Sequence, residues 1–237
     1  MAGQEKLASQ TIFIDLDDTL CENNIHFERA IGDFITFLDH RQHTREQVRA
    51  VLNQVEREHI VKHGYGLNSF AQSLVETFER LSVEPITPAL HQTITGFAHK
   101  IADLPLEIID GVPETLAYLS SRHRLLLMTK GNITEQSSKI ERSGLKEYFN
   151  ATEIVTEKNE AIYRSTVNKY ELDPESTWMV GNSPKSDINP ALAAGLHAVF
   201  VPHDQTWILE HEELSSAPNH GQKLLQLKSF RELVAYF

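Results

Sequence analysis

The stretch TIFIDLDDTL, residues 11–20, begins with a short apolar run of β-rich residues and then places three carboxylates within four positions. Continuous apolar runs of this kind are typical of parallel strands buried on both faces of a sheet. Asp15 and Asp17 directly follow the run. A carboxylate at the tip of a buried strand must be paired, protonated or bound to a cation. The stretch therefore predicts a core strand that delivers acids to a polar site, with Asp18 shaping the following turn.

Similar apolar runs recur later in the chain, each followed by turn or cap residues. They are LLLMT at 125–129, TWMV at 177–180, AVFV at 198–201 and a shorter run around Ile154 and Val155. Amphipathic helical patterns lie between them, at 113–121, 133–143, 159–170 and 188–194. Strands alternating with helices predict an α/β fold with a doubly wound parallel sheet. Functional groups in such sheets gather beyond the carboxyl ends of the strands.

The interval from residue 24 to 107 interrupts this alternation, because it shows no strand pattern. Its apolar residues recur at helical spacing in four groups. The groups are Phe27, Ile31, Phe34 and Leu38, then Val48, Val51 and Val55, then Phe70, Leu74, Phe78 and Leu81, then Leu90, Ile94, Phe97 and Ile101. We therefore expect a helical insertion at 24–107 within an α/β domain built from 1–23 and 108–237.

Charge and composition exclude several classes of partner. The 237 residues carry a formal net charge of -11, without a basic run, which argues against nucleic acid and anionic membranes. No apolar segment resembles a signal peptide or a membrane span, so we expect a cytoplasmic protein. The single cysteine, Cys21, excludes an internal disulfide and a thiolate metal cage. The histidines lack ligand spacing, and the oligomeric state is left open.

Polar residues follow the later strands as well. Thr129, Lys130 and Gly131 supply a hydroxyl, a cation and a permissive backbone beside an expected helix start, which suits a phosphate group. Lys158 begins a helix after the short strand, and Asp187 follows the TWMV run. Carboxylate oxygens without cysteine or histidine favour a hard ion, Mg²⁺ above all.

In this order the motifs resemble those of the haloacid dehalogenase superfamily, most of whose members are phosphatases. DLDDTL is similar to the family's DxDxT motif, and GNSPKSD at 181–187 is similar to its GDSxxxD motif. Thr129 and Lys158 stand in the places of the second-motif hydroxyl and the third-motif lysine, and DGVPETLAYL at 110–119 resembles the usual approach to the second motif. The resemblance spans nearly the whole chain and implies a Rossmann-like core, with 24–107 as an α-helical cap.

The resemblance also implies a reaction, the Mg²⁺-dependent hydrolysis of a small phosphomonoester. Asp15 would attack phosphorus and form an aspartyl phosphate, while Asp17 would protonate the leaving oxygen and then activate water. Thr129 would hydrogen-bond the phosphoryl group, and Lys158 would offset its charge. Mg²⁺ would bind the Asp15 carboxylate, the Asp17 backbone carbonyl and a group of the fourth motif.

Two positions depart from the family pattern. Asn182 stands where an aspartate is common, which leaves open whether Asn182 or Asp187 contacts the metal. Lys130 stands where many relatives have asparagine, and it would either add a cation to the phosphate or substrate, or point to solvent.

In the expected cap, His63 and Tyr65 belong to a glycine-containing loop that would either contact substrate or form a surface turn.

Two alternative activities use similar residues. A metal-independent 2-haloacid dehalogenase of this superfamily would attack carbon with the same first aspartate, but its pattern lacks an acid two residues later, so Asp17 argues against it. A phosphoryl-accepting switch that does not turn over would also use acids, a hydroxyl and a lysine. Such switches are roughly half this size and carry no helical cap.

Overall fold

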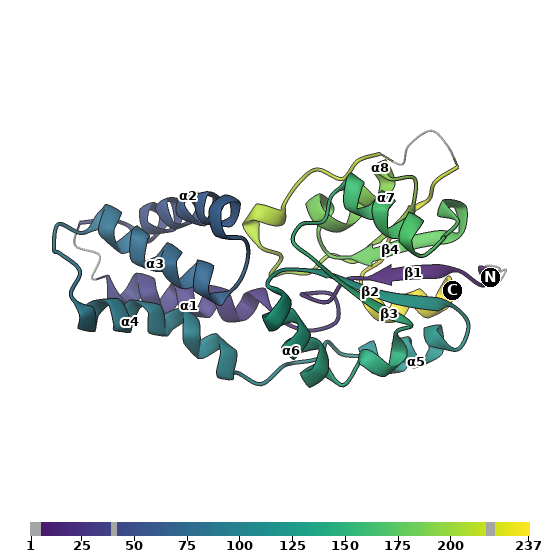
Figure 1. Cartoon of the computed structure of the whole chain (residues 1–237), viewed down its shortest axis with the longest axis horizontal. Coiled ribbons are helices and arrows are strands. Elements are labelled where there is room, and N and C mark those ends of the chain that lie inside the picture. The colour runs from purple at the N-terminus through teal and green to yellow at the C-terminus, as the bar shows by residue number, and fades with distance from the viewer. Residues whose placement is uncertain (1–5, 39–41, 217–220) are drawn as a thin grey trace. The chain divides into compact units, whose positions relative to one another are not determined.

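The computed structural model describes residues 6–38, 42–216 and 221–237. Contacts divide the chain into two compact units. The core unit is formed by Met1–Glu22 and Leu106–Phe237, and the helical unit is formed by Asn23–Pro105 (Figure 1). Within the described ranges, no helix is long and apolar enough to cross a membrane.

A six-stranded parallel sheet with the order β3-β2-β1-β4-β5-β6 organises the core unit. The strands are β1 (Thr11–Ile14), β2 (Arg124–Lys130), β3 (Ala151–Val155), β4 (Thr177–Gly181), β5 (His197–Phe200) and β6 (Leu224–Gln226). In the register, Ile14 lies opposite both Leu127 and Val180. The ends of three central strands therefore meet at one edge. The predicted doubly wound α/β sheet is confirmed, and β6 extends it beyond the strands predicted from the sequence.

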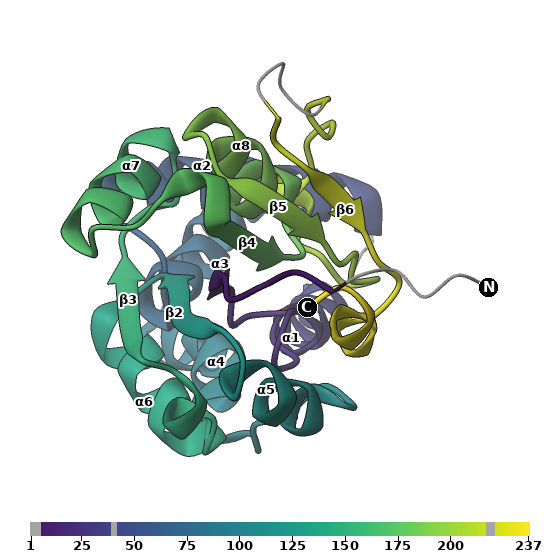
Figure 2. The same cartoon turned by 90° about the vertical axis from the view of Figure 1, so that its right-hand side faces the viewer.

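Helices cover both faces of this sheet (Figure 2). They are α5 (Val112–Ser120), α6 (Ile133–Ser143), α7 (Glu160–Lys169) and α8 (Asn189–Ala193). On one face, Ile12 and Ile14 of β1 pack in a cluster with Leu116 of α5. On the other face, Phe13 packs in a cluster with Tyr163 of α7. Both faces of β1 are buried, which explains why its residues are apolar without alternation.

Short helical segments connect these elements. They are η1 (Lys100–Asp103), η2 (Lys146–Tyr148), η3 (Pro174–Ser176), the π-helical turn η4 (Pro184–Ile188), η5 (Ile208–Glu210) and η6 (Phe230–Ala235). Two of them bear on the candidate site, because η4 comes shortly after β4 and η5 lies in the segment after β5.

In the part of the helical unit that the structure describes, there are four α-helices. They are α1 (Asn24–Phe37), α2 (Arg45–His63), α3 (Leu67–Leu81) and α4 (Pro88–His99). Thr44 and Gln47 begin α2 with a reciprocal capping box. Phe34, Leu74 and Ile94 are fully buried in the apolar cluster that holds the helices together. The helical spacing of these residues in the sequence therefore reflects one shared core.

Candidate active site

Residues from three strand ends meet around the ammonium group of Lys158. Asp15 directly follows β1, Lys158 lies between β3 and α7, and Asp187 belongs to η4 after β4. The Lys158 Nζ atom donates to Asp15 Oδ1 at 2.5 Å and to Asp187 Oδ1 at 2.7 Å. All three side chains are buried. Asn159 stabilises this position of Lys158, because its side chain caps α7 by accepting the Ile162 amide at 3.0 Å.

The electrostatics of this group couple the carboxyl groups to one ammonium. Burial, followed by the carboxylates of Asp187 and Asp17, raises the pKa of Asp15 to about 7 against the opposing effect of Lys158. Burial lowers the pKa of Lys158, but Asp15 and Asp187 outweigh burial and raise it above its ordinary value. The carboxyl groups of Asp15 and Asp187 thus share the single ammonium of Lys158. Such oxygen donors suit a hard divalent cation.

Asp187 is held by a close approach of the backbone. Its Oδ2 atom accepts the Ser183 amide at 3.0 Å. A Cβ atom at Gly181 would lie 2.2 Å from that same oxygen, so the end of β4 needs a glycine to admit the carboxylate. Both oxygens of Asp187 are thus engaged, one by Lys158 and the other by Ser183.

Asn182 belongs to the same network as Asp15. The Thr19 hydroxyl lies 3.0 Å from Asp15 Oδ2 and 3.3 Å from the Asn182 amide oxygen, Oδ1. The Asn182 amide nitrogen donates to Thr206 Oγ1 at 3.0 Å, which fixes the orientation of the amide. The amide oxygen therefore faces the Asp15 side of the site.

Asp17 and Thr129 are joined through α6. Gln136 Nε2 lies 2.9 Å from Asp17 Oδ2 and 2.6 Å from Thr129 Oγ1, and Lys139 Nζ donates to Asp17 Oδ1 at 2.5 Å. Sequence reasoning missed Gln136 and Lys139. A usable signal was present, because residues three apart in a helix share a face, and Asn132 caps the start of this helix beside a predicted site strand.

The placement of Lys130 corrects one of the two roles expected for it. Its side chain is 14% exposed, and its Nζ donates to Glu210 Oε1 at 2.6 Å and to Ser186 Oγ at 2.7 Å. The alternative in which it points to solvent is therefore wrong, because a buried carboxylate from η5 attracts it. Its contact with phosphate stays a prediction.

Gly131 has a φ of 143°, in the region that favours glycine. Its amide donates to the Val155 carbonyl oxygen at 3.0 Å, which continues the pairing of β2 with β3. In this arrangement that amide is committed to the sheet rather than to a phosphate. Gly131 thus permits the turn toward α6. The hydrogen bond to Val155 does not support the prediction that Gly131 binds phosphate.

The predicted substrate residues of the helical unit lie at the junction of two helices. His63 is the last residue of α2, and Tyr65 lies in the turn before α3. The His63 ring is exposed, with its centroid 5.5 Å from that of His59. Their contact with substrate stays a prediction.

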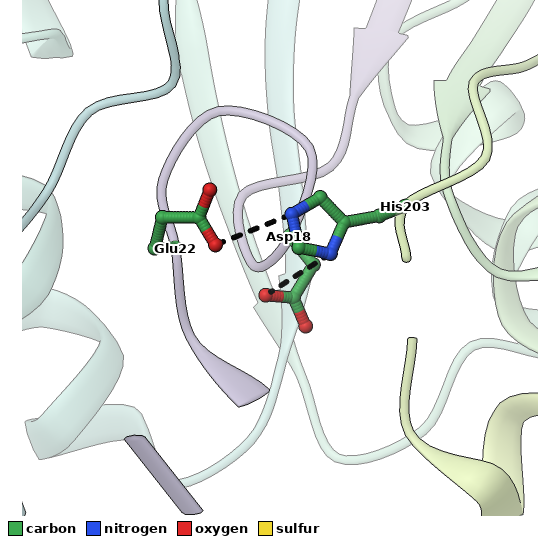
Figure 3. A group of neighbouring side chains, drawn as sticks. All are labelled: Asp18, Glu22 and His203. Carbon is green, nitrogen blue, oxygen red and sulfur yellow. Dashed lines mark ion pairs between the residues drawn. The ribbon is translucent and has the colours of Figure 1, made fainter. Parts of the chain in front are cut away.

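Asp18, Glu22 and His203 form a second group, with the His203 ring between the two carboxylates (Figure 3). His203 Nε2 lies 3.2 Å from Glu22 Oε2, and Nδ1 lies 3.9 Å from Asp18 Oδ1. Because Nδ1 accepts the Gln205 amide at 3.2 Å, the neutral ring carries its proton on Nε2, toward Glu22. One ligand atom from each of the three residues lies within 4.8 Å of the others, a spacing that a metal could use.

The contacts favour a polar link between two segments over a metal centre, since both ring nitrogens of His203 are engaged. The group joins the segment after β5 to the turn after β1, where Asp18 has a φ of 58° and donates its amide to Cys21 O at 2.7 Å. This geometry agrees with the turn-shaping role expected for Asp18. The histidine was missed because it is distant in sequence from both acids.

The family model for haloacid dehalogenase-like hydrolases matches residues 10–195. The chain therefore belongs to this family, and the resemblance expected from its motifs is confirmed.

Two phosphatases and one hydrolase of solved structure are similar to most of this chain. N-acylneuraminate-9-phosphatase of Homo sapiens is 26% identical over 199 residues, and the Mus musculus protein of that name is 28% identical over 200 residues. Each match covers 80% of this chain and 80% of the relative. The solved structure of a haloacid dehalogenase-like family hydrolase from Xanthomonas campestris is 28% identical, with a TM-score of 0.78 over 95% of this chain and 92% of that one. The chain is a hydrolase, and these relatives support the expectation that it is a phosphatase.

Proposed function

We propose that this protein is a Mg²⁺-dependent phosphomonoester hydrolase that acts on a small phosphorylated metabolite through an aspartyl-phosphate intermediate. The buried contact of Lys158 with Asp15 and Asp187 carries the proposal. A nucleophilic carboxylate, a cation and a further acid at the carboxyl edge of a parallel sheet suit the transfer of a highly charged group. Membership of the haloacid dehalogenase-like hydrolases supports this reaction class.

The reaction consists of two displacements at phosphorus. A carboxylate oxygen of Asp15 forms a bond to phosphorus as the bond to the ester oxygen breaks, and Asp17 gives that leaving oxygen a proton. Water then attacks the same phosphorus while Asp17 takes its proton. The bond between phosphorus and Asp15 breaks, which releases inorganic phosphate and restores both side chains. One hard displacement is thereby divided into two easier ones.

The neighbouring side chains stabilise the transferring group. Thr129 would hydrogen-bond a phosphoryl oxygen, and the Lys158 ammonium would offset the charge that the phosphoryl group brings beside Asp15. The distances from Gln136 to Thr129 and Asp17 suit a role in keeping the acid beside the hydroxyl. Phosphate monoesters need accelerations of up to roughly 10²¹-fold, so charges held in place matter here.

The residues fit a bound Mg²⁺ ion, because they offer hard oxygen donors, among them two buried carboxyl groups that share one ammonium. Asp15, the Asp17 main-chain carbonyl, and Asn182 or Asp187 would hold the ion. When bound, Mg²⁺ supplies positive charge to the phosphoryl oxygens. The amide oxygen of Asn182 suits the role of an uncharged metal ligand, because the Thr19 hydroxyl contacts both this oxygen and Asp15.

The helical unit would act as a cap that selects the leaving group, with His63 and Tyr65 as candidate contacts. The relatives named above are N-acylneuraminate-9-phosphatases. A 9-phosphorylated acylated sugar acid is therefore the first substrate to test, followed by other sugar phosphates, nucleoside monophosphates, phosphoglycolate and flavin mononucleotide.

The test is a panel of these phosphorylated metabolites assayed for phosphate release with Mg²⁺, with the Asp15→Asn variant as the blank. We expect multiple turnovers on at least one ester, loss of activity with chelator, and recovery when Mg²⁺ is added back. A blank as active as the wild type would overturn the mechanism. Halide release from 2-haloacids, unaffected by chelator, would instead favour a dehalogenase, and a single phosphorylation without turnover would favour a switch.

A further inference from the structure

Glu210 brings a buried carboxylate to the back of the candidate site from outside the family motifs. It is the last residue of η5, and its side chain is 10% exposed. Its Oε2 atom accepts the hydroxyls of Ser183 at 2.7 Å and of Ser186 at 2.5 Å, while Oε1 accepts the Lys130 ammonium at 2.6 Å. One carboxylate therefore ties the end of β2 to the turn that follows β4.

The turn held by Glu210 is also the turn that carries Asp187. The backbone amide of Ser183 donates to Asp187 Oδ2. The Ser183 hydroxyl accepts the Ser186 amide at 3.0 Å and also donates to Glu210. A second link joins the same segments, because Lys185 Nζ donates to the Leu209 carbonyl at 3.1 Å. Ser183 thus connects the Glu210 carboxylate to the Asp187 carboxylate through one residue.

Removing a charged acceptor from such a network frees several groups together. Charge-assisted hydrogen bonds are among the strongest in proteins, and removal of one partner of a buried ion pair leaves the other charge uncompensated. The Lys130–Glu210 pair and the Lys158–Asp187 pair contact the same turn, one at its serines and the other at its aspartate. The turn is thereby anchored by two separate lysines.

We propose that Glu210 is a positioning residue, which, with Lys130 as its counter-ion, fixes the Ser183–Asp187 turn and so holds Asp187 against Lys158. The inference deepens the proposed function and rests on it for its catalytic consequence. It assigns Lys130 to this turn, in place of the contact with phosphate or substrate that the sequence offers for that residue.

The first test measures the turn itself and needs no substrate. Hydrogen–deuterium exchange of the Ser183 and Ser186 amides is compared in wild type, Glu210→Gln and Glu212→Gln. Glu212 is the matched control, because it is an exposed acid two residues along the chain, and its Oε2 atom accepts the side-chain amide of Asn189 at 2.9 Å. We expect exchange about tenfold faster or more in Glu210→Gln, and unchanged exchange in Glu212→Gln. Wild-type exchange in Glu210→Gln would overturn the proposal.

The second test separates positioning from phosphate binding, with p-nitrophenyl phosphate and Mg²⁺ as the probes. If Glu210 and Lys130 act as one unit, Glu210→Gln and Lys130→Met each lower kcat about tenfold with little change in KM, and the double variant is no worse than either. If Lys130→Met alone raises KM and Glu210→Gln behaves as wild type, Lys130 contacts the substrate and the proposal fails.

The double variant also guards against a folding defect, since it leaves neither buried charge without its partner. We expect it to fold with a wild-type circular dichroism spectrum while the Ser183 and Ser186 amides still exchange fast. Wild-type exchange and wild-type kcat in the double variant would contradict the proposal. They would show that Lys130 and Glu210 only neutralise each other's charge. If the wild type hydrolyses no phosphomonoester, the proposed function fails, yet the exchange experiment still decides the role of Glu210.

Discussion

Replacing Glu56 by glutamine should stabilise the protein above neutral pH. Glu56 lies in α2, and its Oε2 atom is buried with no hydrogen-bond partner among the described residues. The nearby Arg49 guanidinium is committed to Glu28, with two bonds of 2.7 Å. Burial raises the pKa of Glu56 to about 7, with Arg49 opposing this effect and Glu28 adding to it. Glu56 in the folded protein therefore keeps its proton up to a higher pH than Glu56 in the unfolded chain.

The size of the effect follows from the two pKa values. Because the folded pKa is the higher one, stability is lost as pH rises from the unfolded value of 4.5 to the folded value of about 7. At ~1.36 kcal/mol per pKa unit, the interval between 4.5 and about 7 corresponds to ~3 kcal/mol of unfolding free energy. Glutamine resembles the protonated acid in shape and does not titrate, so the variant escapes this loss.

The assay is urea unfolding of wild type and Glu56→Gln near pH 4.5 and pH 8. The difference in unfolding free energy should shift in favour of the variant by ~3 kcal/mol between the two conditions. Glu58→Gln is the matched control on the same helix, because Glu58 pairs with Arg80 at 2.5 Å and its pKa is lowered by hydrogen bonds from Arg80 and Gln54. A difference between Glu56→Gln and wild type that does not change with pH would refute the reasoning.

Two further substitutions test the site geometry. In Gly181→Ala the added Cβ would meet Asp187 Oδ2 at 2.2 Å, so we expect displacement of that carboxylate and a fall in kcat of about 100-fold, measured with p-nitrophenyl phosphate. Activity near the wild-type level would show that the close approach does not matter. In Lys139→Met, Asp17 loses a contact of 2.5 Å, and we expect kcat to fall about tenfold with KM unchanged, whereas Lys146→Met, an exposed lysine, should behave as wild type. Equal kinetics in both lysine variants would remove Lys139 from the account.

The strands could be predicted because each buried strand is a run of adjacent apolar residues in the sequence. The TIFI run coincides with β1 (Thr11–Ile14), and the run at 125–129 lies within β2 (Arg124–Lys130), since a strand covered on both faces must be apolar throughout. The edge strand β6 was not predicted. It is only three residues long and only partly buried, so it carries no periodic pattern.

Residues held by distant partners were harder to predict. Glu210 lies among the surface-like acids of the WILEHEE stretch, and its burial depends on Lys130, which is 80 positions earlier. The preference of Lys130 for Glu210 over solvent could not be deduced for the same reason. Gln136 was within reach of sequence reasoning, because it lies one turn into a helix that begins beside Thr129.

The central claim is that Asp15 carries the phosphoryl group during turnover. Wild type, Asp15→Asn and Asp17→Asn are mixed with Mg²⁺ and p-nitrophenyl phosphate, quenched in acid and digested, and the peptide containing residues 11–20 is examined by mass spectrometry. Because the nitrophenolate leaves without a proton whereas the second step needs a base, Asp17→Asn should accumulate the intermediate. The account predicts a phosphoryl group on Asp15 in Asp17→Asn and none in Asp15→Asn. A phosphoryl group on another residue, or phosphate release by Asp15→Asn at the wild-type rate, would contradict it.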